Sequence, residues 1–437
     1  MITEAFLQYV WQHRLWQGNL LTVDGRAVEV ERQGDMNRDA GPDFLNARVR
    51  VGDVDWAGSV EVHIHSSDWH LHGHSADPAY GNVVLHVVMH YDSDVLLSNS
   101  SAVPTVELAS YINPEALAAY QRLMAEGAGD VACADILREV PEFIVSSYWE
   151  RLAVERLERK TADVDRLLAD AHGSWEDVCF WLVARYLGGK TNGFAFEMLA
   201  KSVPLRIVAK IGPDLFRIES LLFGQAGMLE GEFCDEYPRS LQREYQYLRK
   251  AYSLQPMPAG LWKFFRIRPS GFPTVRIAQL AGLMCANGNI FSKLLDMDKA
   301  DTLVDFFQSE ASAYWTDHYR FDKSSTAQAK RLGRGEALSL VVNAWVPLLF
   351  AFGKAHGNAD QPLLAIELLR QLPPEQNTVT RTWKALGLTP RNALHSQAQN
   401  QLLGQYCTQR RCLECRFGSQ AICRGRRNPK TETNITQ

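Results

Sequence analysis

The sequence has no strong excess of charge of either sign, because 46 lysines and arginines stand against 50 aspartates and glutamates, a formal net charge of −4. Such a balance gives no global attraction for nucleic acid, so any basic surface must be local. The sequence also lacks GxxxxGK[ST], GxSxG and, after a predicted strand, GxGxxG. The sequence therefore gives no support for a P-loop ATPase, for a hydrolase with a nucleophile elbow or for a dinucleotide-dependent enzyme.

Long apolar runs are lacking as well. The longest, residues 338–353, is interrupted by Asn343 and Pro347 and is too short to span a bilayer. The first residues, MITEAFLQYVWQHRLW, predict an amphipathic helix and not a signal peptide. We therefore expect a cytoplasmic protein without a membrane partner.

The local patterns predict an α+β protein with several parts. Residues 1–16 have helical periodicity, and about 20–110 read as short strands, with a hairpin around Asp24-Gly25. Beyond Asn113 the pattern is helical. We predict a small mixed β-sheet domain with a flanking helix at 1–112 and a large all-α domain at 113–400. A Cys-cluster module at 401–425 and a disordered tail at 426–437 follow.

Seven of the twelve histidines lie between Asp43 and His90, inside the predicted sheet. Imidazole nitrogens and carboxylate oxygens are the usual ligands of catalytic divalent metals. In the segment VEVHIH, alternation places three apolar residues on one face of a half-buried strand and Glu61, His63 and His65 on the other. His70, His72 and His74 lie in a predicted loop, for which a solvated His-rich loop is the alternative.

An Asp that opens one strand, followed by Glu-x-His on its hairpin partner, resembles the core of the PD-(D/E)xK nucleases. The resemblance implies that Asp43 and Glu61 hold Mg²⁺ or Mn²⁺. His63 stands where that family usually has the lysine that assists the attacking water. A helix before the strands often adds a further Glu, which would be Glu4, and His65 would be a supporting group.

The register of the hairpin decides whether these groups meet. A two-residue turn at Gly52-Asp53 would pair Phe44 with Glu61 and send Asp43 to the opposite face. A three-residue turn, or a bulge near Gly58, would bring Asp43 beside Glu61 or His63. The nuclease interpretation therefore requires an irregularity in this hairpin.

Four cysteines crowd into 17 residues near the C-terminus as Cys-x4-Cys-x2-Cys-x7-Cys. Thiolates at such spacings can close on Zn²⁺ or on a [4Fe–4S] cluster. In a reducing compartment this pattern indicates a metal more often than disulfides. The predicted ligands are Cys407, Cys412, Cys415 and Cys423.

Two groups of arginines could contact phosphates, and nucleic acid is therefore a candidate partner. One group surrounds the cysteines, and the other lies in FRIRPSGFPTVRIAQLAGL, where a loop enters a predicted helix. A solvated tail and structural ion pairs are the respective alternatives. The predicted contacts are Arg266, Arg268, Arg276, Arg410, Arg411 and Arg416.

The whole sequence, with WQHRLW, GPDFLNARV, GSVEVHIHSSDWHLHGH, YGNVVLHVV, FPTVRIAQLA and a terminal CxxxxCxxC, resembles a bacterial family of unknown function, DUF2851. That resemblance implies shared architecture and supplies no activity. Our leading hypothesis is a metal-dependent nuclease-like protein that acts on phosphodiesters. The alternatives are a non-catalytic nucleic-acid or protein-binding module with a degenerate nuclease core, and a His/carboxylate metallohydrolase of small molecules.

Overall fold

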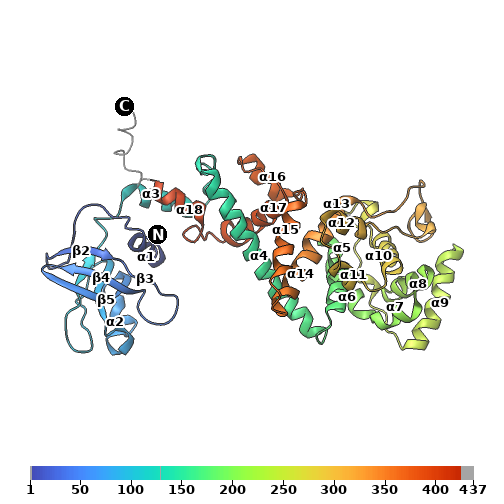
Figure 1. Ribbon diagram of the computed structural model, residues 1–437, viewed down its shortest axis with the longest axis horizontal. Coiled ribbons are helices and arrows are strands. Elements are labelled where there is room, and N and C mark those ends of the chain that lie inside the picture. The colour runs from blue at the N-terminus through green and yellow to red at the C-terminus, as the bar shows by residue number, and fades with distance from the viewer. Residues whose placement is uncertain (1, 128, 425–437) are drawn as a thin grey trace. The chain divides into compact units, whose positions relative to one another are not determined.

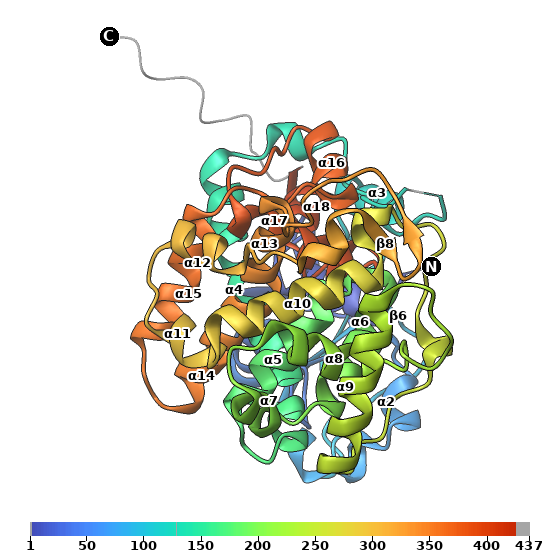
Figure 2. The same ribbon diagram turned by 90° about the vertical axis from the view of Figure 1, so that its right-hand side faces the viewer.

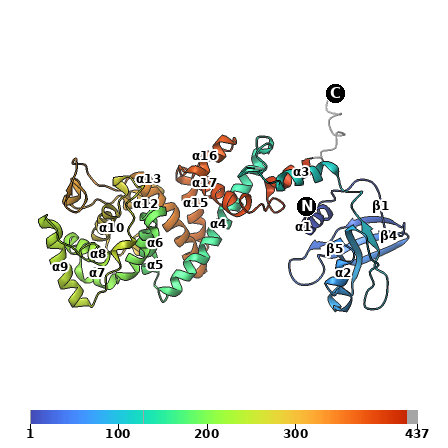
Figure 3. The same cartoon turned by 180° about the vertical axis from the view of Figure 1, so that it is seen from behind.

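The computed structural model describes residues 2–127 and 129–424, and the predicted tail at 426–437 lies outside them. The chain forms two compact units (Figures 1 and 3). Unit 1 comprises residues 1–145 and 402–437, and unit 2 comprises residues 146–401. We placed the domain boundaries after residues 112 and 400. The compact units divide after 145 and 401. Both added segments contact the N-terminal helix, because Tyr120 stacks on Phe6 and Ser419 accepts a hydrogen bond from the Tyr9 hydroxyl.

Unit 1 is built on a mixed β-sheet, as predicted. Its strand order is β1-β2-β4-β5-β6-β7, and β3 pairs with β4. The pairs from β1 to β5 are antiparallel, whereas β6 lies parallel to both β5 and β7. The strands are β1 (Leu20–Leu21), β2 (Ala27–Arg32), β3 (Asp35–Met36), β4 (Phe44–Val51), β5 (Val54–His65), β6 (Val83–His90) and β7 (Thr105–Glu107).

The helices of unit 1 precede, interrupt and follow this sheet. Thr3 caps the first helix by accepting a hydrogen bond from the Phe6 N–H, and Asn113 caps the third in the same way. Figure 3 shows the second helix beside β5, which it contacts. The elements are α1 (Glu4–Gln12), α2 (Asp68–Leu71), η1 (His74–Ala76), η2 (Pro78–Tyr80), α3 (Pro114–Met124), η3 (Leu137–Glu139), the π-turn η8 (Leu403–Cys407) and α18 (Arg416–Cys423).

The β4–β5 hairpin contains the irregularity that the sequence analysis required. Val51 pairs with Val54 around the two-residue turn Gly52-Asp53, but Phe44 pairs with Val60 instead of Glu61. The register shifts between Phe44 and Ala47, where Asn46 adopts a left-handed φ of 58°. One extra residue in β4 thus reverses the side to which the start of the strand points.

Gly58 lies opposite this bulge and allows β6 to approach β5 closely. A Cβ at Gly58 would lie 2.5 Å from the Asn82 carbonyl oxygen and 2.5 Å from Val84 Cγ1. The β5–β6 pairing also shifts here, between Ser59 and Val60. A side chain at residue 58 would therefore force apart the strands that lead into the histidine cluster.

Unit 2 is helical, as predicted, with one small two-stranded sheet. Figure 2 shows α10 crossing this unit beside α5 and α8, both of which it contacts. The helices are α4 (Glu142–Asp170), α5 (Trp175–Leu187), α6 (Gly189–Ser202), α7 (Leu205–Ile211), α8 (Leu215–Gln225), α9 (Glu236–Tyr252), α10 (Pro273–Asn287), α11 (Ile290–Leu295), α12 (Ala300–Phe307), α13 (Arg334–Leu340), α14 (Val346–Ala355), α15 (Asp360–Gln371), α16 (Thr378–Ala385) and α17 (Ala393–Leu402). The shorter elements are η4 (Ala259–Leu261), η5 (Pro269–Gly271), η6 (Ala313–Thr316), the π-turn η7 (Val341–Trp345), β8 (His318–Arg320) and β9 (Lys323–Ser324).

The longest apolar run belongs to the core of unit 2. The helix from Arg334 to Ala355 continues through η7 and is long and apolar enough to cross a membrane by length and composition. The helix that contains the run is therefore longer than the run itself. However, 67% of its most apolar window is buried inside the structure, as in the core helix of a soluble protein.

A buried carboxyl group lies between three elements of unit 2. Glu219 of α8 is fully buried and accepts hydrogen bonds from the hydroxyls of Tyr237 and Ser312, the latter at 2.9 Å. Burial raises the pKa of Glu219 to about 7, against the lowering effect of the two hydroxyls.

Candidate metal centre

Asp43 and Glu61 lie side by side because of the bulge in β4. The Asp43 N–H donates to Glu61 Oε2 at 3.0 Å, and Asp43 Oδ2 accepts from the Val62 N–H at 3.1 Å. Gln8 of α1 donates its side-chain amide to Asp43 Oδ1 at 2.9 Å. The two carboxyl groups at the start of β4 and in the middle of β5 are thus held by backbone and by α1.

Three imidazoles gather beside Glu61. His63, His72 and His74 each offer a ring nitrogen, and these atoms all lie within 4.8 Å of one another. His63 Nε2 is 3.4 Å from Glu61 Oε1 and 3.2 Å from His72 Nδ1. His74 Nε2 is also 3.4 Å from Glu61 Oε1, is buried, and makes no hydrogen bond. Such an unpartnered nitrogen aimed at a carboxylate fits a metal ligand.

The segment after β5 brings two of these histidines to the strand. Gly73 has a φ of 73°, which turns the chain between α2 and η1 so that His72 and His74 both approach His63. The fully buried Trp69 contacts His74 and His86 edge-on, and its indole N–H donates to Ser75 Oγ at 3.0 Å. Tyr80 stacks on His74 at a ring distance of 3.8 Å.

His86 of β6 supports His63 from the opposite side. His86 Nε2 is 2.9 Å from His63 Nδ1, so the other nitrogen of His63 is left to face Glu61 and His72. This arrangement is that of an outer partner that orients a metal-binding imidazole. For a half-buried strand we expected the polar face of β5 to meet solvent. It is buried instead, because Glu61 and His63 are only 5% and 1% exposed.

The electrostatics of the centre favour a cation. Burial, together with the charges of Asp43 and Glu4, raises the pKa of Glu61 to about 8. Burial also raises the pKa of Asp43, and burial and the charge of Asp43 raise that of Glu4. Burial lowers the pKa of His63 to about 4, which keeps its ring neutral and able to bind a metal at neutral pH. Carboxyl groups that repel one another in this way are stabilised by a divalent ion.

The remaining predicted members of the centre take different positions. Glu4 of α1 is half-buried and close enough to Asp43 for their charges to interact. His65 lies at the end of β5 with its side chain 49% exposed, and its Nδ1 is 3.7 Å from Asp92 Oδ2. The structure thus brings Glu4 toward the carboxyl groups and leaves His65 outside the imidazole group.

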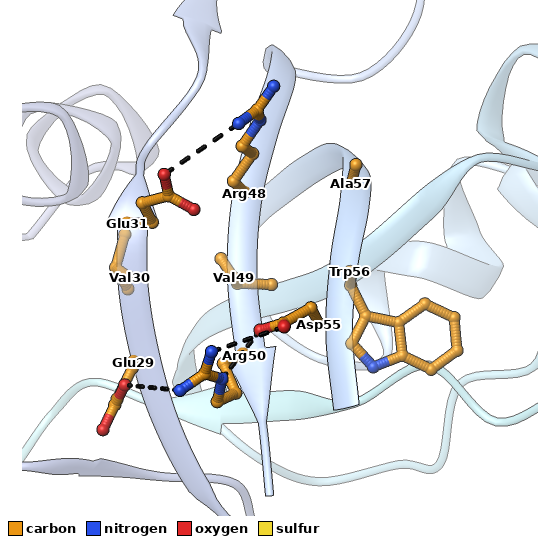
Figure 4. A pocket seen from close by; sticks show the side chains of 9 residues that line it. All are labelled: Glu29, Val30, Glu31, Arg48, Val49, Arg50, Asp55, Trp56 and Ala57. Carbon is orange, nitrogen blue, oxygen red and sulfur yellow. Dashed lines mark hydrogen bonds and ion pairs between the residues drawn. The ribbon is translucent and has the colours of Figure 1, made fainter. Parts of the chain in front are cut away.

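A second surface of the sheet, shown in Figure 4, is charge-paired. Arg50 contacts both Asp55 and Glu29, and Arg48 lies 3.9 Å from Glu31. Because alternate residues share a side, this surface lies on the same side of β5 as Glu61. With three acids and two arginines it offers no basic path for a polyanion.

Some of the arginines predicted to contact nucleic acid make hydrogen bonds within the protein, and others are exposed. Arg276 is buried in α10, where it donates to Gln279 and Glu336 at 3.0 and 3.1 Å. Arg268 is exposed. Arg266 is exposed too, has a φ of 59°, and its guanidinium lies over the Phe265 ring.

Around the cysteines, Arg410 donates to the Gly129 carbonyl at 3.0 Å and Arg411 pairs with Glu414 at 2.5 Å. Arg416 is exposed at the start of α18. For this group the alternative that we gave was a solvated tail, whereas Arg410 and Arg411 both contact the protein in the structure.

The predicted cysteine ligands do not share one environment. Cys412 and Cys415 are buried, and Cys407 and Cys423 are partly exposed. Charges on Cys415 and Cys412 act on Cys407. Cys423, in contrast, lies with its Sγ 3.5 Å from the Tyr9 hydroxyl.

Sequence reasoning selected His63 and left His72, His74 and His86 outside the site. One signal was available: in HLHGH, which begins five residues after the Glu-x-His strand ends, a glycine separates two histidines at a spacing of two residues. For His86, parallel pairing of β5 with β6 places it opposite Glu61, and a strand order of this kind is not visible in the sequence.

The sequence pattern described as protein of unknown function (DUF2851) matches residues 4–378. The chain belongs to the DUF2851 family. The match includes all of α1, the sheet and the histidine segment, so the candidate centre of this DUF2851 protein lies inside the family region. No curated protein and no solved structure matches the chain.

Proposed function

We propose that this DUF2851 protein is a metal-dependent hydrolase of phosphodiester bonds, with a nuclease-like centre in unit 1. The observation that carries the proposal is that Glu61, which contacts Asp43, lies beside a group of three histidines from β5 and the segment after α2. Glu61 and the trio of His63, His72 and His74 would hold the ion, and Asp43 would complete the site. Three imidazoles beside carboxylates favour Mn²⁺ or Zn²⁺ over Mg²⁺.

The chemistry follows from the donor set. A bound divalent ion polarises a phosphoryl oxygen and lowers the pKa of a bound water. The Asp43 carboxylate accepts a hydrogen bond from Gln8 with one oxygen and from the Val62 N–H with the other. It is therefore fixed in position to orient a water or accept its proton. His72 is exposed, so the trio is open to a substrate on that side.

The choice of a phosphodiester as substrate rests on the order of elements. Helix α1, with Glu4 near Asp43, comes before the strands, and Asp43 precedes β4. Glu61 and His63 occupy the Glu and Lys positions on the hairpin partner. This matches what the resemblance to the PD-(D/E)xK core implies. The Asp43 carboxyl group accepts from the Val62 N–H, next to Glu61, and its charge acts on Glu61. This argues against the binding-module alternative, which expects Asp43 to face away from Glu61.

The three-histidine group favours a second candidate, a metallohydrolase of small molecules, because a set of imidazoles and one carboxylate also suits such enzymes. For either activity we propose a cytoplasmic location. The eight cysteines are all free, which suits a reducing compartment.

The test is cleavage of labelled single- and double-stranded DNA and RNA with Mn²⁺, Zn²⁺ or Mg²⁺. Wild type is compared with Glu61→Gln and with Glu31→Gln, a control on the charge-paired surface of the same sheet. We expect cleavage that Glu61→Gln abolishes and Glu31→Gln retains. No cleavage of any polynucleotide, together with metal-dependent hydrolysis of a small phosphodiester such as bis(p-nitrophenyl) phosphate, would favour the small-molecule enzyme. No hydrolysis of either substrate by metal-loaded protein would overturn the proposal.

A further inference from the structure

Unit 2 contains a long stretch of chain without any acidic residue. Between Glu244 and Asp296 the sequence has seven lysines and arginines and no aspartate or glutamate, although the chain as a whole is slightly acidic. Residues 262–272, which lead into α10, form a loop that we name the basic loop. It holds three of the seven cations, Lys263, Arg266 and Arg268. Positive charge is therefore concentrated locally in a chain whose overall charge would not attract a polyanion.

The three cations of the basic loop are exposed. In the part of the chain that the structure describes, no carboxylate oxygen lies within 4.0 Å of their side-chain nitrogens. A fourth cation, Arg320 of β8, adds positive charge beside the loop, because its guanidinium lies 4.3 and 4.9 Å from the ring centres of Phe264 and Phe272. Arg276 differs from these four, since it pairs with Glu336 at 3.1 Å. Exposed cations without a carboxylate partner are available to neutralise phosphates.

An aromatic ring is exposed among these cations. Phe265 is 79% exposed, and the guanidinium of Arg266 lies 5.3 Å from the centre of its ring. Arg266 itself has a left-handed φ of 59°, which is uncommon for a residue with a side chain and is found most often at functional sites. An aromatic side chain that lies in water beside cations is typical of surfaces on which unpaired bases stack.

Hydrogen bonds hold the basic loop at both ends. The side-chain amide of the buried Asn192 accepts from the Lys263 N–H at 2.9 Å and donates to the Lys263 carbonyl at 2.8 Å. At the other end, the Gly271 N–H donates to the Arg268 carbonyl at 2.8 Å in the turn η5. The exposed ring and its neighbouring cations are thus presented on an ordered backbone, which reduces the entropy that a ligand must overcome on binding.

A groove adjoins the C-terminal end of the basic loop. Arg268 lines a cavity of about 960 Å³ together with residues of α12, of α13 and of the segment before α16. The two acidic residues in its lining, Glu336 and Glu375, are held by protein partners: Glu336 pairs with Arg276, and Glu375 accepts from the side-chain amide of Asn343 at 2.9 Å. A flexible polymer that contacts the basic loop therefore has room to continue past Arg268.

The form of the partner follows from the exposed ring. A base can stack on Phe265 only when it is not already stacked inside a duplex, so a single strand fits better than a double strand. A membrane surface would require a larger apolar area, whereas Phe265 is the only exposed large hydrophobic side chain among residues 255–272, all of which the structure describes.

We propose that the basic loop binds a single-stranded polynucleotide. One base stacks on Phe265, and the neighbouring phosphates contact Lys263, Arg266 and Arg268. The choice of a polynucleotide over an acidic protein rests on the phosphodiester hydrolase proposed above, and the basic loop specifies a single strand as its substrate. Binding at this loop uses none of the residues of the metal centre and requires no metal ion.

The test measures binding of a fluorescein-labelled single-stranded oligonucleotide to the full-length protein by fluorescence anisotropy, in EDTA so that no cleavage occurs. We expect Phe265→Ala to raise the Kd about 5- to 140-fold, the loss that corresponds to one base stacked on an aromatic ring. Phe265→Trp should retain wild-type affinity. Phe143→Ala should retain it too, because this phenylalanine of unit 1 is 69% exposed but follows Glu142 and not a cation. Arg268→Ala should reduce the slope of log Kd against log salt concentration by about 0.7.

Three results would overturn the proposal. The first is an affinity for the oligonucleotide that Phe265→Ala leaves unchanged, or that is equal for the duplex of the same sequence. The second is competition by poly-glutamate as effective as competition by the unlabelled oligonucleotide, which would mean attraction by charge alone. The third is binding to phosphatidylserine vesicles, lost in Phe265→Ala, without any binding of the oligonucleotide.

The outcome for the basic loop is separable from the outcome for the hydrolase. Binding in EDTA that depends on Phe265, together with no cleavage in any metal, would retain the basic loop and reject the hydrolase. Cleavage that requires Glu61, together with binding that Phe265→Ala does not change, would retain the hydrolase and reject the basic loop.

Discussion

Replacing the buried Glu219 with glutamine should remove a pH-dependent weakness from unit 2. In the folded protein the pKa of this carboxyl is raised from 4.5 to about 7 because burial penalises its charged form. Between these two values the folded state holds a proton that the unfolded state has released. Stability from this group is therefore complete below pH 4.5 and is lost as the pH rises through about 7.

The size of the effect follows from the two pKa values. A difference of about 2.5 units, at 1.36 kcal/mol for each unit, corresponds to about 3 kcal/mol of unfolding free energy. Glu219→Gln keeps a neutral group that can still accept from the hydroxyls of Tyr237 and Ser312. We therefore expect equal stability of wild type and variant near pH 4.5 and a variant about 3 kcal/mol more stable at pH 8.

Urea denaturation between pH 4.5 and 8, followed by tryptophan fluorescence, measures this difference. Glu232→Gln, at an exposed position, serves as the control and should follow the wild-type profile. Parallel profiles of wild type and Glu219→Gln would refute the reasoning, because they would mean that the buried carboxyl titrates as it does in the unfolded chain.

Three further predictions concern the metal centre, the sheet and α10. In calorimetric titrations with Mn²⁺, His72→Ala should abolish tight binding. His86→Ala should weaken binding about 10- to 100-fold, because His63 loses its orienting partner. Unchanged affinity in both variants would show that these histidines do not belong to the site. Gly58→Ala should lower the unfolding free energy by about 1–3 kcal/mol in urea, since its Cβ meets Asn82 and Val84, whereas Gly231→Ala, with open space around it, should not. Arg276→Ala should cost about 2 kcal/mol of stability through its lost buried hydrogen bonds and should leave the affinity for a labelled oligonucleotide unchanged. Arg268→Ala, at an exposed position, is the comparison. Weaker oligonucleotide binding by Arg276→Ala alone would show a direct contact.

The sequence predicts the strands of unit 1 well because their patterns are local. FLNARVRV and the hairpin at Gly52-Asp53 are found as predicted, and alternation correctly places Glu61 and His63 on one side of β5. The α+β class follows from the change to helical periodicity after Asn113. Such features depend on neighbours in the chain, which a single sequence displays.

The candidate site is only partly predictable for the same reason. The need for an irregularity near Gly58 could be inferred from the sequence. Its position in β4 could not, because nothing in FLNARVRV marks Asn46 as the residue with a left-handed backbone conformation. The contact of Arg410 with the Gly129 carbonyl could not be predicted either, since the two residues are distant in sequence. Pairing of this kind is set by tertiary structure.

The division of unit 1 into two stretches of chain has a consequence for biosynthesis. Residues 146–401 are complete before the ribosome adds the segment from Leu402 onward, which belongs to the same compact unit as the sheet. Domains usually fold in the order of their synthesis, N-terminal first. Here unit 2 is continuous in sequence, whereas α1 lacks its contacts with α18 until the later segment is made, because Ser419 and Cys423 contact Tyr9. A nascent chain that stalls before residue 402 would therefore hold all of unit 2 and a unit 1 that lacks the contacts of Tyr9 with α18.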